Sequence, residues 1–466
     1  MDSQHNGNVD LRLSPGKNVI TIPELNSNEL RPNVAKAGVL YTVNPYTKEQ
    51  QIRSPKIKIE GAFEYPAFVL GQDSDEAIMK ELEEYVDKLE KDPTLPDVYE
   101  VFSKKNLVNT RATYALDWYK KNNLLPSYTA NKVDGIVAEA MKFWGFDGSS
   151  EVNSDYNYRY VSMLKWLDNG GFMNAGNGIT GYNQNEQGAV LGYNTGWGLM
   201  HELGHNMDTA RMSVVEVTNN MLPLHFEVLE GKASRFSQQN QYEANIFPKV
   251  TREDYSNNIW YPENDYSNLQ HIAPLWQLQL YDETFWPRLQ QEFRANTSLG
   301  GGSWDNKHEA WVIAASNVMQ MDLTEHFARH GFRVNEETAE HMKQYQKTTK
   351  KLWYMNDNKY LKEGEAFNEN FNLKLHPKVN EENVTLTMEI DRENNKSLLG
   401  YEIYRDGSLI GFTNKETYVD KEAVMGTNHT YEVVAFSNDL NSAEGVSVKA
   451  HAHKLEAQKD IVIELN

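Results

Sequence analysis

The 466-residue chain contains no cysteine, so neither a disulfide framework nor a thiolate metal site is available to it. Any bound metal must therefore be held by histidine and carboxylate side chains. The sequence also lacks a run of 18 or more apolar residues, the length that a membrane-spanning helix requires. We therefore expect no membrane insertion.

Positive charge is scarce. The chain has 46 lysines and arginines against 66 aspartates and glutamates, a formal net charge of −20. Nucleic acids and anionic membranes require a basic surface that displaces their counterions, so the composition argues against both partners. A neutral or cationic partner, or a glycan, is easier to accommodate. The 39% hydrophobic content, with 11% aromatics, is sufficient for two or three folded domains.

A targeting signal is not visible at the start of the chain. The opening residues, "MDSQHNGNVDLRL", have neither the basic nor the apolar region of a signal peptide. We expect either a cytosolic protein or one whose leader precedes this sequence. The richness in Asn, Tyr and Trp favours the second, a secreted or cell-surface bacterial protein.

The pattern of the chain changes twice, which predicts three segments. Residues 1–60 contain short β-type runs, "NVITIP", "AGVLYTV" and "PKIKIEG", that predict a small β element. Residues 61–375 begin with a capped amphipathic helix in which Ile78, Leu82, Val86 and Leu89 recur every three or four positions. Helical patterns dominate from about residue 105 to residue 345.

Residues 376–466 show alternating short strands, among them "VTLTMEID", "HTYEVVAFS" and "GVSVKAHA". The "RDG" in "GYEIYRDGSLIGFT" separates two alternating runs, which is typical of a β-hairpin, and the regular strand spacing predicts a β-sandwich. This segment resembles a fibronectin type III-like module. Such modules usually act as spacers or binding appendages, and we assign it no chemistry.

The stretch "GLMHELGHNMD", residues 198–208, contains the strongest functional signal. His201 and His205 are four residues apart, so on an α-helix they project from one face and can bind one metal ion. Glu202 lies to the side of that pair, where it can act as a general base on a metal-bound water without being a ligand. Apolar neighbours favour a buried helix here. The alternative is two structural histidines that happen to lie one turn apart.

A catalytic zinc site requires a third protein ligand. The continuation HExxHxxGxxH is excluded, because Asp208 and Arg211 occupy the positions of its glycine and third histidine. The gluzincin alternative takes a glutamate from the next helix, and Glu216 lies between two valines in "SVVEVTNNML". A lone buried carboxylate is costly without a partner, so we predict Glu216 as the third ligand. The alternative is an exposed helix residue.

Polar side chains close to these residues are candidates for orienting the ligands, since a metal-bound imidazole usually donates its other N–H to a carboxylate or a carbonyl. The candidates are Asp208, Asn219 and Asn220. A plain surface role is the alternative for each of them.

The residues around the motif carry a family resemblance. "GLMHELGHNMD" followed by "VVEVTNNML" resembles the enhancin-like zinc metallopeptidases, gluzincins that include viral enhancins and bacterial mucin-degrading O-glycopeptidases. The resemblance extends over roughly residues 15–345, through "AFEYPAFVLGQ" on one side and "SNVMQMDLTEHFARHGFRV" on the other. It implies a zinc endopeptidase that acts on mucin-type O-glycoproteins, with the sugar helping to position the scissile bond.

Residues 170–198 are crowded with Gly and Asn and directly precede the motif. They predict either a long surface loop or strands and loops that wall a cleft. A gluzincin substrate typically adds a strand to a sheet edge, and the segment from Ala189 to Tyr193 is the candidate edge strand. The substrate-binding candidates are Ala189, Val190, Leu191, Gly192, Trp197, Tyr242, Trp260, Tyr261 and His271. Among them, Tyr242, Tyr261 and His271 are also candidate donors to the transition-state oxyanion. Core or loop packing is the alternative for the aromatic residues.

The expected fold is thus multidomain α+β: a mostly helical gluzincin-type zinc peptidase domain, an N-terminal β element and a C-terminal β-sandwich. Two other functions remain open. One is a glycan-binding adhesin on a peptidase scaffold, and the other is a zinc protease without glycan dependence.

Overall fold

The computed structural model describes residues 14–19, 58–92, 94–154, 160–164, 173–176, 178–260, 269–302, 304–380, 382–424 and 427–452. The β element predicted for residues 1–60 lies almost entirely outside these residues. By its internal contacts the chain divides into two compact units, and each is described by itself. The first comprises Met1–Lys142 with Ser154–Met207, and the second comprises Phe143–Asn153 with Asp208–Asn466.

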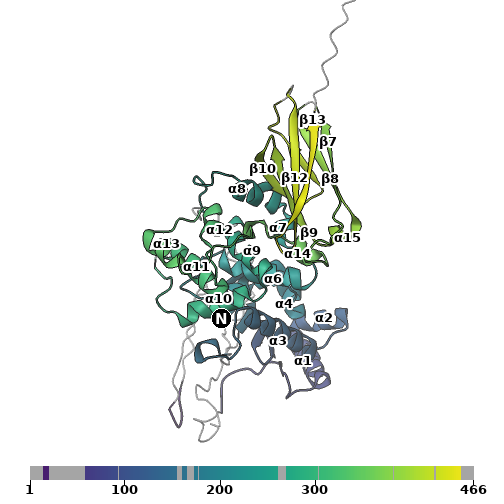
Figure 1. Ribbon diagram of the computed structural model, residues 1–466. Helices are drawn as coiled ribbons and strands as arrows, with labels where there is room; N and C mark the ends of the chain where they lie inside the picture. Colours follow the sequence, from purple (N-terminus) through teal and green to yellow (C-terminus); the bar gives the residue numbers. More distant parts are fainter. Residues whose placement is uncertain are drawn as a thin grey trace, which may run out of the picture. The chain divides into compact units, whose positions relative to one another are not determined.

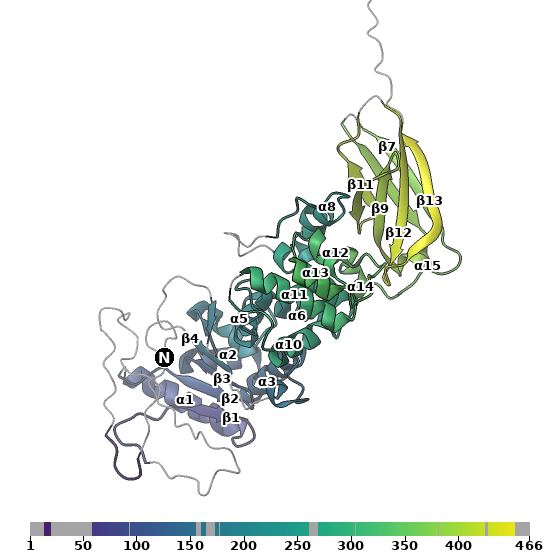
Figure 2. The same ribbon diagram turned by 60° about the vertical axis from the view of Figure 1, so that its left-hand side comes forward.

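The first unit contains a six-stranded mixed sheet of order β1-β2-β3-β4-β6-β5. Figure 2 labels the strands β1 to β4 of this sheet. Its strands are β1 (Ala67–Val69), β2 (Tyr99–Phe102), β3 (Asn106–Thr110), β4 (Tyr160–Leu164), β5 (Met173–Gly176) and β6 (Ile179–Tyr182). The pairs β1–β2, β3–β4 and β4–β6 are parallel, whereas β2–β3 and β5–β6 are antiparallel. The strand β5 therefore ends the described sheet.

This sheet was not predicted, because the sequence of its central strand β3 lacks the apolar pattern of a buried strand. All five residues of β3 are buried, although three of them are polar. Asn109 donates to Glu100 Oε1 over 2.8 Å, Asn106 donates to Tyr193 Oη over 3.0 Å, and Thr110 bonds Gln187. Buried polar groups are tolerated when they are hydrogen-bonded, and here the partners lie up to 87 residues away in the sequence.

The helices of the first unit are α1 (Asp75–Lys91), α2 (Ala112–Asn122), α3 (Pro126–Phe143), α4 (Gln187–Gly192) and α5 (Trp197–Met207), with the short 3-10 turn η3 (Gln184–Glu186). The 3-10 turn η2 (Glu151–Asn153) belongs to the second unit. The predicted amphipathic helix is α1, and it is confirmed. Ser74 caps it by accepting from the Ala77 N–H over 3.2 Å. Its buried residues are Ile78, Leu82 and Tyr85, so the buried stripe is shorter than predicted.

The second unit contains short helices and a β-sandwich (Figure 1). Its α-helices are α6 (Met221–Leu229), α7 (Arg235–Gln238), α8 (Phe247–Val250), α9 (Ala273–Tyr281), α10 (Phe285–Ala295), α11 (Trp304–Met319), α12 (Thr324–Arg329), α13 (Glu336–Met342), α14 (Asn358–Leu361) and α15 (Arg392–Asn395). Further turns are η4 (Thr218–Asn220), the π-type turn η5 (Tyr242–Ile246), η6 (Leu269–His271) and η7 (Leu352–Tyr354).

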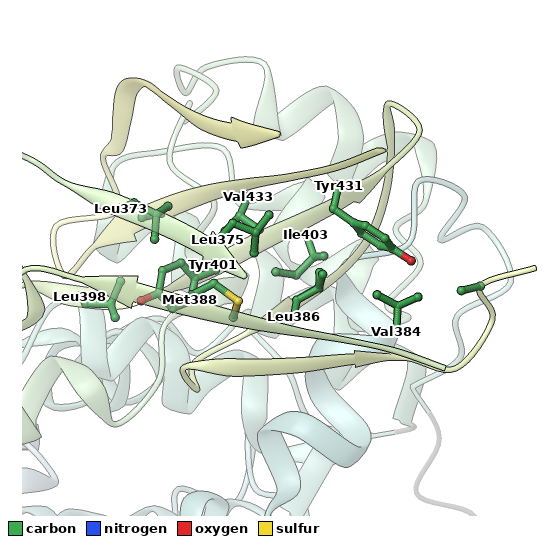
Figure 3. Packing of buried hydrophobic residues seen from close by; sticks show 12 residues of the cluster. Leu373, Leu375, Val384, Leu386, Met388, Leu398, Tyr401, Ile403, Tyr431 and Val433 are labelled. Atoms are coloured by element: carbon green, nitrogen blue, oxygen red, sulfur yellow. The ribbon is translucent and has the colours of Figure 1, made fainter. Parts of the chain in front are cut away.

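The C-terminal strands form two sheets, one of order β10-β9-β12-β13 and one of order β11-β8-β7. The strands are β7 (Leu373–Val379), β8 (Val384–Ile390), β9 (Leu398–Arg405), β10 (Ser408–Thr413), β11 (Thr417–Asp420), β12 (His429–Ser437) and β13 (Ser442–Ala452). Side chains from both sheets meet in one core, which includes Leu386 and Met388 from one and Tyr401 and Val433 from the other (Figure 3). A β-sandwich is therefore present, and it begins with β7, three residues before the predicted boundary.

The predicted hairpin at "RDG" joins β9 to β10, with Arg405 opposite Ser408. Asp406 and Gly407 both have positive φ, 52° and 85°. Two left-handed residues in a two-residue loop match the twist of the flanking strands, which explains why Asp-Gly marks such hairpins.

The sandwich is bound to the helical part of its own unit by a buried interface. The Tyr354 ring from η7 stacks on Phe412 from β10, with ring centroids 4.0 Å apart and an interplanar angle of 9°. Phe247 from α8 packs against the same ring at 4.7 Å. Glu243 accepts hydrogen bonds from the Thr413 hydroxyl over 2.7 Å and from the Asn414 N–H over 3.0 Å. The sandwich is thus packed into the unit rather than tethered to it.

A buried carboxylate lies at the centre of this interface. Glu402 of β9 is 2% exposed. It accepts from the Tyr354 hydroxyl over 2.7 Å and from the Tyr404 hydroxyl over 2.9 Å, and it forms an ion pair with Lys351. Burial and the nearby Glu402 charge both raise the pKa of Tyr354, so its hydroxyl remains a donor.

Glu402→Gln should lower the free energy of unfolding by roughly 2 kcal/mol, because it removes the charge that compensates the partly buried Lys351 ammonium. Urea denaturation followed by circular dichroism measures the change. Glu389→Gln is the matched control, since the Glu389 side chain is 60% exposed and its ion pair with Lys374 is solvated. Equal midpoint shifts in the two variants would contradict the structural role of Glu402.

Candidate metal centre

The helix α5 has the sequence WGLMHELGHNM and begins four residues after the left-handed Tyr193 that ends α4. Leu199, Met200, Leu203 and Met207 are buried, which fixes the helix against its surroundings as the apolar spacing predicts. The predicted helical setting of the motif is therefore confirmed.

The two histidines of α5 turn their rings toward one another. His201 and His205 are both half-buried, and their Nε2 atoms lie 3.2 Å apart. Two nitrogen ligands at 2.0–2.1 Å from a tetrahedral zinc ion are about 3.3–3.4 Å apart. The pair of nitrogens thus has the spacing that one shared metal ion requires.

Glu216 joins the two histidines. Among the described residues, one group of three or more His, Cys, Asp or Glu side chains could hold a metal ion, and it consists of His201, His205 and Glu216. Their potential ligand atoms all lie within 4.8 Å of one another. Two imidazole nitrogens and one carboxylate oxygen are a donor set that suits zinc and leaves a position open. The residues present therefore fit the metal that the sequence implies.

The setting of Glu216 differs from the prediction. It lies in a turn before η4 rather than on a helix, and its φ is +63°, in the left-handed region. Val217 is 2% exposed, but Val215 is 60% exposed, so the carboxylate is not enclosed between two buried valines. A side chain with a Cβ in this conformation costs roughly 1–2 kcal/mol. Such strain persists where the surrounding structure holds it in place.

Hydrogen bonds from both sides hold this turn. The Thr218 hydroxyl donates to Asp208 over 2.7 Å and accepts from the Val214 N–H over 3.0 Å. The Asn220 amide donates to the Glu216 carbonyl over 2.7 Å. Asp208 and Asn220, predicted as ligand-orienting residues, thus support the backbone that carries Glu216. Asn219 is fully buried in η4.

The charge balance of this loop includes one lysine. Lys307 of α11 donates to the Ser213 carbonyl over 2.6 Å. Burial lowers the pKa of the Lys307 ammonium, and the carboxylate of Asp208 acts in the opposite direction. A cation is therefore held against the backbone of the loop that leads to Glu216.

Glu202 lies on α5 next to His201 and is 8% exposed. It does not belong to the group of potential ligands, and the general-base role predicted for it stays a prediction. A largely buried carboxylate beside a metal site is well placed to exchange protons with a water.

The predicted edge strand is wrong in position. Ala189, Val190, Leu191 and Gly192 form most of the short helix α4, in which Val190 and Leu191 are buried. The apolar run packs inward as a helical turn, and Tyr193 ends this turn in the left-handed conformation. The edge of the sheet is formed by β5, earlier in the same Gly- and Asn-rich segment.

Two aromatic substrate-binding candidates are core residues. Tyr242 is 2% exposed and donates to Asp357 over 3.1 Å. Trp260 is 2% exposed, and its indole N–H donates to the His271 carbonyl over 2.9 Å. These rings have no surface to offer a sugar, so their predicted substrate contacts are wrong. Burial and the Asp357 charge hold the pKa of Tyr242 well above its usual range. The candidate His271 is also buried, with 7% of its surface exposed.

The remaining candidates stay predictions. Trp197 begins α5 and is half-buried. Tyr261 lies outside the described residues. Asn206, directly after His205, escaped the sequence analysis. Its amide bonds three groups of the β5–β6 hairpin, and its adjacency to the motif was the available signal.

Together the His-Glu-x-x-His helix, the nearby carboxylate and the mixed sheet define a protein of the metallopeptidase class. The chain belongs to the peptidase M60, enhancin and enhancin-like family, whose model matches residues 61–331. A comparison with curated protein sequences found no match.

No helix in the described part of the chain is long and apolar enough to cross a membrane.

Solved structures of Clostridium perfringens proteins are similar to this chain. The catalytic module of the metalloprotease ZmpA is 59% identical, with a TM-score of 0.88 over 97% of this chain and 87% of that one. The ZmpB metallopeptidase is 44% identical, with a TM-score of 0.90 over 96% and 88%. The M60 catalytic domain of ZmpC, solved in complex with the sialyl T antigen, is 45% identical, with a TM-score of 0.87 over 94% and 86%.

Glu216→Ala and Glu216→Gly should both lose the bound metal on dialysis, because each removes the third donor. The glycine variant should unfold with a free energy about 1 kcal/mol higher than the alanine variant when both are metal-free, since glycine accepts a positive φ. Atomic spectroscopy and urea denaturation measure the two effects. Asn123→Gly, at the left-handed end of α2, is the control and should keep its metal. Full metal content in Glu216→Ala would place the third ligand elsewhere.

Proposed function

We propose that this protein is a zinc-dependent endopeptidase that hydrolyses peptide bonds in mucin-like, O-glycosylated proteins. The observation that carries the proposal is the convergence of His201, His205 and Glu216, with Glu202 on the same helix as the two histidines. Membership of a metallopeptidase family supports the reaction type.

His201, His205 and Glu216 would hold the zinc ion, and when bound it would polarise the scissile carbonyl and make a water acidic enough to attack at neutral pH. The protein's own part is to fix these three donors before the metal arrives. The helical period of α5 fixes the two imidazoles, and the hydrogen bonds of Thr218 and Asn220 fix the turn that carries Glu216.

Glu202 would act as the proton carrier. As general base its carboxylate accepts a proton from the attacking water, and as general acid it delivers that proton to the departing amide nitrogen. Its 8% exposure supports this role, because a carboxylate shielded from bulk water transfers its proton to the substrate rather than to solvent.

The choice of an O-glycosylated substrate rests on the relatives. The ZmpC catalytic domain was solved with the sialyl T antigen, a glycan, and is 45% identical to this chain. We therefore propose that a mucin-type glycan beside the scissile bond is recognised here too, by a secreted or cell-surface bacterial enzyme. A glycan-binding adhesin is less well supported, because a pure binder has no use for Glu202 beside a complete set of metal ligands.

Glu202→Gln should retain its metal and lose at least about 1,000-fold in kcat on an O-glycosylated mucin peptide, since the amide cannot accept the proton. Metal analysis and mass-spectrometric detection of the cleaved peptide measure the two properties. Glu83→Gln is the control, because Glu83 is half-exposed and pairs with Lys120 at the surface. A Glu202→Gln enzyme that cleaves at the parent rate would rule out the general base.

Removing the O-glycan from the same peptide should lower kcat/KM by at least about 100-fold, because polar groups that bind the sugar would then lack a partner. Cleavage of the glycosylated and the unglycosylated peptide by the parent enzyme is compared by mass spectrometry. Equal rates would identify a zinc protease without glycan dependence. Binding of the glycopeptide without cleavage, by metal-loaded protein, would support the adhesin.

A further inference from the structure

We propose that Asn206 is a positioning residue that fixes the edge strand β5 relative to Glu202 and thereby sets where an extended substrate lies. The inference rests on the proposed peptidase function and adds to it the element that aligns the substrate. Three steps support it: the contacts of Asn206, the register of the hairpin, and the geometry of α5.

The Asn206 amide makes three hydrogen bonds to one short segment. Its Oδ1 accepts from the Gly178 N–H over 3.0 Å. Its Nδ2 donates to the Ile179 carbonyl over 3.2 Å and to the Thr180 hydroxyl over 3.2 Å. One side chain thus uses both ends of its amide to hold three consecutive residues.

Gly178 makes the first of these bonds possible. Its φ is +78°, which an L-residue with a Cβ rarely adopts, and this conformation directs its N–H toward α5. The two residues that follow it begin β6. The turn that leads into β6 is therefore held at the helix.

The register transmits this position to β5. Ile179 and Thr180 of β6 lie opposite Gly176 and Ala175 of β5 in an antiparallel pair. Within the described sheet β5 is the last strand in the order, so its outer edge is the side on which a further strand can be added. Residues held by Asn206 are thus the direct ladder partners of the edge strand.

The geometry of α5 connects the hairpin to the chemistry. Asn206 lies four residues after Glu202, so the two side chains project from the same side of the helix, one turn apart. The helix packs against both β5 and β6. A substrate paired with β5 would therefore have its distance from Glu202 set through Asn206.

Only an amide can make all three bonds. An aspartate at this position keeps the acceptor for Gly178 but loses both donations, and its charge faces the Ile179 carbonyl. A displacement of about 1 Å of a substrate from its reactive position can cost roughly 100-fold in rate. Asn206→Asp therefore tests the alignment with little change in side-chain volume.

The experiment measures kcat on an extended O-glycosylated peptide, per mole of folded, metal-loaded enzyme. We expect Asn206→Asp to keep its metal and to lose about 10–100-fold in kcat, as is usual for residues that orient a metal site or its substrate. Thr180→Val, which removes one acceptor, should lose less, and Thr180→Ser, which keeps the hydroxyl, should match the parent. Asn131→Ala is the control, because the Asn131 amide bonds only the Ser127 carbonyl of its own helix in the described contacts.

A parent-like kcat in both Asn206→Asp and Thr180→Val would overturn the inference, since a purely structural role changes the amount of folded enzyme and not kcat. Loss of metal in Asn206→Asp would also overturn the inference, because Asn206 would then hold α5 and its ligands in place rather than align the substrate. Equal cleavage of glycosylated and unglycosylated peptides by the parent would refute the glycan requirement alone and leave the variant comparison readable. A parent that cleaves neither peptide would overturn both proposals.

Discussion

The structure around the site depends on one geometric constraint: two imidazole nitrogens on a single helix must meet a carboxylate from another part of the chain. The helical period places His201 and His205 on one face at no cost to the backbone, and their Nε2 atoms lie 3.2 Å apart. The third donor has no such regular element to position it. Glu216 lies in a turn, and the polar residues around that turn form hydrogen bonds that stabilise its conformation.

The left-handed conformation of Glu216 shows how the turn is held. A glycine would adopt φ +63° without strain, but it has no carboxylate. The backbone of Glu216 is therefore strained at this position. The bonds from Thr218 to Asp208 and from Asn220 to the Glu216 carbonyl offset it, each contributing on the order of 1 kcal/mol. Asp208, the first residue after α5, is thereby hydrogen-bonded to the turn that carries Glu216.

Features of the structure could be predicted when the interactions that specify them join residues close together in the sequence. The motif helix and the hairpin at Asp406 and Gly407 were predicted correctly because neighbouring residues specify them. The strand β3 was missed because two of its three polar residues, Asn106 and Thr110, bond partners 87 and 77 residues away along the chain. Trp260 was misjudged because its burial depends on ring contacts with Trp311 and Phe332, which lie 51 and 72 residues further along the chain.

The Gly- and Asn-rich segment before the motif also combines features that could be predicted from the sequence with features that could not. Its composition predicted strands and loops, and Gly178, with φ +78°, leads into β6, but composition does not say which residues form the edge. The apolar run at Val190 and Leu191 looked like the strand, yet burial made it a helical turn. The polar stretch Met173–Gly176 forms the edge strand β5 instead, and Asn206 of α5 hydrogen-bonds the hairpin that contains it. The part of this segment that packs against α5 thus carries side-chain hydrogen bonds from that helix, a feature that apolar content does not reveal.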